Sequence, residues 1–155
     1  MSANDNLKDR LAADIKTALL AGEREKADVL RGLKSAILYE EVAQKKRDEG
    51  LDDASIEQII ARESKKRDEA AVLYEKGGSQ ERADKERWEK TVIAVYLPEQ
   101  LTNEELNAIV AEVLAVEGSD AHVGKVIGAV KVRVGNSADG ARVASAVQQA
   151  VKGRT

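Results

Sequence analysis

The stretch VYLPEQLTNEEL at residues 95–106 ends one helical region and begins another. It contains Pro98, the only proline in the 155-residue chain, and a proline moves the residue before it away from helical backbone angles. Thr102 and Glu105 follow with the spacing of a capping box, an arrangement that starts helices. We therefore predict that one helix ends just before Pro98 and that another begins at Asn103.

The density of charge changes at the same place. Residues 1–97 carry 19 basic and 21 acidic side chains, whereas residues 98–155 carry 6 and 7. Dense charges of mixed sign are typical of long helices with exposed faces. We therefore predict two domains, residues 1–97 and residues 98–155.

Composition favours an all-α fold. Aromatic residues make up 3% of the chain and phenylalanine is absent, whereas β proteins need branched and aromatic strand formers and many turns. In the N-terminal domain, apolar residues recur at helical spacing in four segments, which predicts a bundle of about four helices. The apolar positions are Leu7, Leu11, Ile15 and Leu19; Leu30, Leu33, Ile37 and Leu38; Ile56, Ile59, Ile60, Ala70 and Leu73; and Trp88, Val92, Val95 and Tyr96.

The pentapeptide KKRDE occurs at residues 45–49 and again at residues 65–69, with unlike flanks. We expect the second helix to run into the first copy and the third helix to contain the second copy. Both copies are interpreted as solvated helix faces on which opposite charges pair one turn apart. A contact surface for RNA or protein is the alternative. The caps expected for the third and fourth helices are Asp52 or Asp53, and Ser79.

Three further apolar stripes predict three short helices in the C-terminal domain. The caps expected for the second and third of them are Ser119 or Asp120, and Ser137 or Asp139. We interpret the alternating segment 130–134 as helix, because an isolated strand would have no pairing partner. The stripes are Leu106, Ile109, Val110, Val113 and Leu114; Val123, Val126, Ile127, Val130 and Val134; and Val143, Val147 and Val151.

The residue patterns of the common enzyme classes are missing. A chain without cysteine forms no disulfide, thiolate nucleophile or cysteine-based zinc site, and the single histidine, His122, cannot build a histidine-rich one. Walker A, dinucleotide-binding and nucleophile-elbow motifs do not occur. We therefore predict no catalytic residue, no metal and no cofactor, and expect His122 to face solvent or to cap a helix.

The N-terminus and the hydropathy of the chain indicate where in the cell the protein is expected. The N-terminus is polar, without the apolar region of a secretory signal, and the sequence has no long uncharged apolar run. We therefore expect a cytoplasmic protein that has no membrane partner.

Basic residues gather near the C-terminus. Residues 120–155 hold six basic and two acidic side chains, although the whole chain has a net charge of −3. This local excess indicates an anionic partner. The six are Lys125, Lys131, Arg133, Arg142, Lys152 and Arg154.

Two glycines and two lysines lie away from the apolar stripe of the helix predicted around residues 123–134. They are Gly124, Lys125, Gly128 and Lys131. Small residues let a bulky partner approach a backbone and lysines neutralise phosphates; alternatively, the glycines permit close helix packing and the lysines only add solubility. Few aromatic side chains are available for stacking on bases, so nucleic acid would be recognised by shape and backbone.

Three motifs together resemble the YqeY family of small bacterial proteins. They are Val95-Tyr96-Leu97-Pro98-Glu99-Gln100-Leu101, Gly124-Lys125-Val126-Ile127-Gly128 and Ala138-Asp139-Gly140, and the similarity covers nearly the whole chain. This resemblance implies a helical N-terminal bundle followed by a three-helix domain similar to the tail of GatB, a subunit of the glutamine-dependent amidotransferases that act on tRNA. Many relatives have a basic residue where this chain has Ser137.

The function that the resemblance implies is binding. We expect tRNA as a partner, together with an amidotransferase or another translation protein; any carbon–nitrogen ligase activity is implied only by the family. A helical adaptor between proteins is the alternative. The residues expected to bind nucleic acid are Gly124, Lys125, Gly128, Lys131, Arg133 and Arg142.

Overall fold

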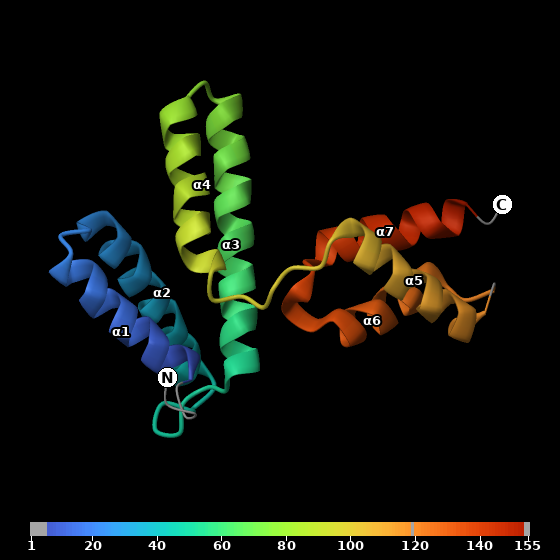
Figure 1. Cartoon of the computed structure of the whole chain (residues 1–155), viewed down its shortest axis with the longest axis horizontal. Coiled ribbons are helices and arrows are strands. Elements are labelled where there is room, and N and C mark those ends of the chain that lie inside the picture. The colour runs from blue at the N-terminus through green and yellow to red at the C-terminus, as the bar shows by residue number, and fades with distance from the viewer. Residues whose placement is uncertain (1–5, 119, 154–155) are drawn as a thin grey trace. The chain divides into compact units, whose positions relative to one another are not determined.

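The protein is all-α, as predicted. The computed structural model describes residues 6–118 and 120–153, and every regular element in them is a helix (Figure 1). These residues divide into two compact units, with the division between Leu97 and Pro98. No helix among the described residues combines the length and the apolar character that a membrane crossing requires.

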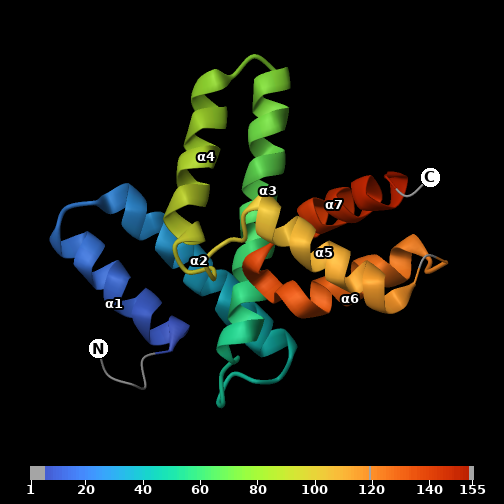
Figure 2. The ribbon, with the colours of Figure 1, turned by 45° about the vertical axis from the view of Figure 1, so that its right-hand side comes forward.

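Unit 1 consists of two helical hairpins. They are α1 (Leu7–Leu20) with α2 (Arg24–Ala43), and α3 (Asp53–Lys76) with α4 (Gln80–Ala94). The tips of the two hairpins point apart in both views (Figures 1 and 2). The hydrophobic core lies at the other ends of the hairpins, where the four helices converge. Its most deeply buried members are Leu11, Leu30, Leu33, Ile37, Ile56, Ile60 and Ile93.

Residues on the predicted stripes differ in burial along the helices. Ile56 and Ile60, in the first turns of α3, are buried, whereas Leu73 near the tip of the same helix is 68% exposed. Leu38 and Val95 are also exposed. Periodicity identifies the face of a helix that turns inward, but how much of that face is covered depends on how far the neighbouring hairpin extends.

The interpretation of the first KKRDE copy as a helix face is wrong. Helix α2 ends at Ala43, and residues 45–49 form a loop in which Lys45 has a positive φ of 58°. The second copy lies in α3, as expected, and there Asp68 accepts a 2.6 Å hydrogen bond from Lys90 of α4. Side-chain charge pattern alone does not distinguish a solvated helix from a polar loop.

A buried carboxylate joins α1, α2 and this loop. Glu41 of α2 is fully buried, and its two oxygens each accept a 2.9 Å hydrogen bond from the Lys8 ammonium of α1. The same carboxylate accepts a 3.1 Å bond from the backbone N–H of Leu51. A side chain at Gly50 would crowd it, because a Cβ there would lie 3.3 Å from a Glu41 oxygen in a backbone with φ of 76°.

Unit 2 packs three helices around an aliphatic core. The helices are α5 (Asn103–Glu117), α6 (Val123–Val134) and α7 (Gly140–Lys152), with a short 3₁₀ turn, η1 (Gly135–Ser137), before the last. The segment 130–134 is helical, as we inferred. The most deeply buried core members are Val110, Val126, Val130, Val143 and Val147.

The helix caps confirm most of the sequence-based assignments. Thr102 and Glu105 form both bonds of the capping box at the start of α5, and Asp139 caps α7 by accepting from the Arg142 N–H. Asp120 does not cap α6; the cap is His122, whose Nδ1 accepts a 3.1 Å bond from the Gly124 N–H. Ser119, the other candidate, lies outside the described residues.

In unit 1, Asp52 caps α3, accepting a 2.8 Å bond from the Ser55 N–H. Ser79 occupies the cap position of α4 but makes no capping side-chain bond. The helix begins there without the polar cap that the sequence predicted.

We predict that Glu41→Gln lowers the free energy of unfolding of unit 1 by about 2 kcal/mol, because hydrogen bonds to a charged group contribute about 1.5–3 kcal/mol. Urea unfolding followed by the fluorescence of Trp88, the only tryptophan, measures this unit. Glu40→Gln, at the neighbouring and partly exposed position, is the control and should change stability by no more than about 0.5 kcal/mol. Equal losses in the two variants would contradict the role of Glu41.

The contribution of Glu41 should also depend on pH. Burial raises the pKa of its carboxyl, but the hydrogen bonds from Lys8 and Leu51 and the Lys8 charge outweigh this, so the pKa lies below its usual 4.5. A depressed folded-state pKa gives stability that is complete above the unfolded value and lost as pH falls through the folded one. The gap between wild type and Glu41→Gln should therefore be full near pH 7 and shrink below about pH 4; a gap of constant size would refute this.

Candidate nucleic-acid interface

One face of α6 carries the glycines and lysines identified in the sequence. Buried valines at 126, 130 and 134 hold the opposite side of the helix against α5 and α7. Gly124, Lys125, Gly128 and Lys131 are therefore all exposed. We call these four residues the glycine–lysine face.

The glycines of this face are not needed for packing. A Cβ built on Gly128 meets nothing within 4 Å, and one built on Gly124 meets only the ring of its own cap, His122, at 3.3 Å. The interpretation of these glycines as close contacts between helices is therefore wrong for the described residues. They leave a strip of α6 backbone open to the outside.

The two lysines that flank this strip differ in their ion pairing. The Lys125 ammonium lies 3.2 Å from the Glu117 carboxylate, in a pair whose lysine side chain remains 69% exposed. Lys131 makes no ion pair with any described residue, and its ammonium lies 3.4 Å from the position that a Cβ on Gly140 would take. Glycine at 140 thus leaves room for the Lys131 side chain over the start of α7. Because exposed ion pairs contribute little free energy, Lys125 can exchange Glu117 for another anion.

The two candidate arginines have partners on α5 or just before it. Arg133 forms a 2.6 Å ion pair with Glu112. The half-buried Arg142 donates from Nη2 to the Leu101 carbonyl at 2.7 Å and to the Asn103 side-chain oxygen at 2.9 Å. Arg142 therefore ties the start of α7 to the start of α5, and its loss would disturb unit 2 as well as any interface.

Sequence reasoning missed the residues that modify this surface. Glu112 and Glu117 come from α5, and no local pattern links them to the basic residues of α6. Val132, 85% exposed, does carry a local signal, because it follows Gly124 and Gly128 at successive intervals of four. In segment 130–134 this helical spacing coincides with an alternation of valines and basic residues that is also typical of a strand.

The chain was compared with protein-family models and with curated proteins. The family model described as Yqey-like protein matches residues 8–151. No curated protein matches the chain. The match covers both units and confirms the resemblance carried by the three motifs, so the chain belongs to the YqeY family.

Proposed function

We propose that unit 2 binds tRNA through the glycine–lysine face of α6. The observation that carries this proposal is the open space at Gly128, which lies in the middle of α6 on its exposed face, between Lys125 and Lys131. A glycine in a helix interior costs about 0.5–1 kcal/mol relative to alanine, and no neighbour in unit 2 uses the space. Close approach by an outside partner explains the glycine.

The chemistry of the face favours a phosphate backbone. Lysines on both sides of an open strip can neutralise phosphates that come close to the helix. Residues 98–155 contain no Phe, Tyr or Trp, so stacking on unpaired bases is not available to unit 2. Recognition would therefore use shape and backbone, which is how proteins commonly bind base-paired RNA.

The family supplies the choice of tRNA. The C-terminal part resembles the tail of the GatB amidotransferase subunit, and we therefore propose an accessory role in translation, beside an amidotransferase that acts on tRNA. Addition of the chain to such an enzyme should change its transamidation rate; an unchanged rate would remove this part of the proposal.

We predict that replacing both Lys125 and Lys131 by glutamine weakens tRNA binding and flattens its salt dependence. Each lost phosphate contact should reduce the slope of log affinity against log salt by about 0.7–0.9. The measurement is titration of the full chain into bulk tRNA at several salt concentrations, with duplex DNA as competitor. Salt-independent binding, or equal preference for the DNA, would contradict the proposal.

A matched control has the same change of net charge in unit 1. Lys16 and Lys34 are exposed lysines without an ion pair among the described residues, so the control variant carries glutamine at both. It should bind tRNA like wild type. An equal loss in the control would move the interface to unit 1, and binding of a protein that survives nuclease in place of tRNA would favour the adaptor alternative.

We further predict opposite effects of Gly128→Ala on stability and binding. The thermal stability of unit 2 should rise by about 0.5–1 kcal/mol, because alanine is the better helix former and its methyl group meets open space. Affinity for tRNA should fall, and fall further in Gly128→Leu. Ala111→Leu on the exposed face of α5 is the control for added bulk, and unchanged affinity in both Gly128 variants would exclude close approach at this strip.

A further inference from the structure

A cleft of about 270 Å³ lies in unit 1, where α2, α3 and α4 meet. Its size is just below the usual range of small-molecule sites, about 300–1,000 Å³. The cleft belongs to the wedge between the two hairpins and is separate from the glycine–lysine face. It does not depend on the proposed binding of tRNA.

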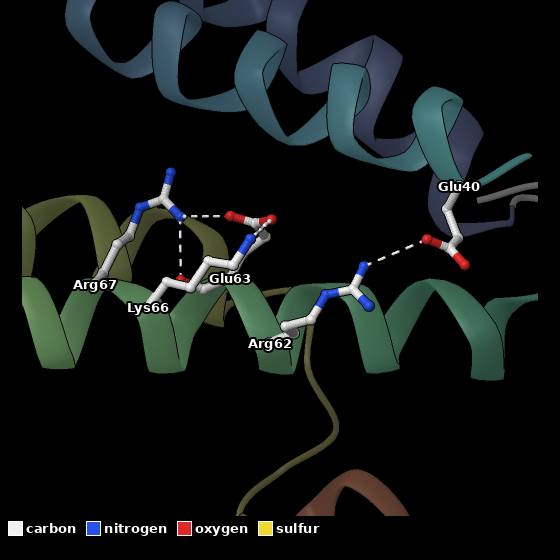
Figure 3. A network of polar contacts seen from close by, with 5 residues as sticks. All are labelled: Glu40, Arg62, Glu63, Lys66 and Arg67. Atoms are coloured by element: carbon white, nitrogen blue, oxygen red, sulfur yellow. Dashed lines mark hydrogen bonds and ion pairs between the residues drawn. The ribbon is translucent and has the colours of Figure 1, made fainter. Parts of the chain in front are cut away.

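Arg67 of α3 lines this cleft with an incomplete set of hydrogen bonds. Its Nη1 donates to the Glu63 carbonyl at 3.2 Å and lies 3.5 Å from the Glu63 carboxylate (Figure 3). Its Nε is buried and has no partner, and Nη2 has none among the described residues. Ser64, one turn earlier on α3, also has a buried hydroxyl without a partner.

The unused part of Arg67 has a defined chemistry. Burial shuts Nε off from the cleft, so Nη2 is the accessible nitrogen, and it can donate a charge-assisted hydrogen bond to a carboxylate. In Figure 3 the outer nitrogen of Arg67 points away from α3, on the side of the α1–α2 hairpin. The Arg67 side chain is only 17% exposed, so water serves Nη2 poorly and a carboxylate in the cleft would bond to it.

The rest of the lining has charges of both signs. Lys85 of α4 adds a second cation, whereas Glu25 and Asp28 of α2 and Glu89 of α4 supply three carboxylates. Glu25, Lys85 and Glu89 form no ion pair with any described residue, whereas Asp28 lies 3.7 Å from the Arg31 guanidinium. The three carboxylates would repel a ligand that carries only negative charge. A ligand that carries only positive charge would leave Arg67 without a hydrogen-bond acceptor. A ligand with one carboxylate and an excess of positive charge matches both parts.

Two further residues favour a small ligand at this place. Trp88 of α4 is 38% exposed in the cleft and offers an indole face on which a cationic group can stack. Gly32 of α2 lines the cleft in the middle of a helix, and a Cβ built there meets nothing within 4 Å. Glycine at this position keeps the cleft open at the expense of helix stability.

We propose that this cleft binds a basic amino acid, either free or as the C-terminal residue of a peptide. The carboxylate accepts a hydrogen bond from Nη2 of Arg67, with Lys85 beside it. The cationic groups face Glu25, Asp28 and Glu89, and the side chain lies on Trp88.

The test uses the fluorescence of Trp88 in the full chain, which reports on the cleft directly because it is the only tryptophan. Titration with L-arginine should change the emission in a saturable way. Agmatine, which lacks the carboxylate, and succinate, which lacks the cation, should each bind at least tenfold more weakly. Tighter binding of glycyl-glycyl-arginine than of L-arginine would assign the site to a peptide C-terminus, and weaker binding would assign it to the free amino acid.

Arg67→Lys tests whether binding needs the guanidinium group itself or only its positive charge. It keeps the positive charge but lacks the outer nitrogen Nη2, so L-arginine should lose its advantage over agmatine. The matched control is Arg62→Lys on the same helix, where Arg62 pairs with Glu40 at 3.6 Å outside the cleft (Figure 3). This control should bind L-arginine like wild type.

Gly32→Leu provides a second variant that fills the cleft from an exposed helix position and should fold at least as stably as wild type. It should abolish the response to L-arginine while the urea midpoint is kept. Three results would overturn the proposal: no saturable response of the wild-type chain, equal affinities for L-arginine and agmatine, or equal losses in Arg62→Lys and Arg67→Lys.

Discussion

The carboxylate of Glu41 is the constraint on which the arrangement of unit 1 depends. It is a fully buried charge, and such a group is tolerated only when its oxygens are bonded and its charge is compensated. Lys8 and the Leu51 N–H meet both conditions, which holds the start of α1 and the 44–52 loop at the end of α2. The hairpins are thus fastened at one end and diverge at the other, and the cleft beside Arg67 lies in the resulting wedge.

Unit 2 has a comparable tie in Arg142, which bonds the Leu101 carbonyl and the Asn103 side chain. The sequence presents Arg142 as one more cation in a basic region. Its contacts show that a basic residue can hold helices together, whereas Lys131 of the same unit makes no ion pair with any described residue. Counting charges therefore overestimates the cations that are available to an anionic partner.

The two candidate surfaces share one feature, a glycine inside a helix: Gly32 in the cleft of unit 1 and Gly128 on the glycine–lysine face of unit 2. Each lies on the exposed face of a helix, where alanine would be more stable, and each faces open space. Glycines that serve a turn, such as Gly50 with its positive φ, are explained by the fold itself. The two helical glycines have no explanation within their own unit, and both lie beside cations with unused bonding capacity.

The sequence by itself determined the helices, because stripes, caps and Pro98 act over a few residues: the Thr102–Glu105 capping box and the exposed face of α6 were predictable. The same local signals wrongly predicted a helix face at residues 45–49, because the charge pattern does not distinguish a loop from a helix. Only the tertiary structure decided that Lys8 meets Glu41, that Leu73 stays exposed and that an edge of Arg67 is left unpaired. These outcomes depend on which helices meet and how far they overlap, and no spacing within one helix encodes that.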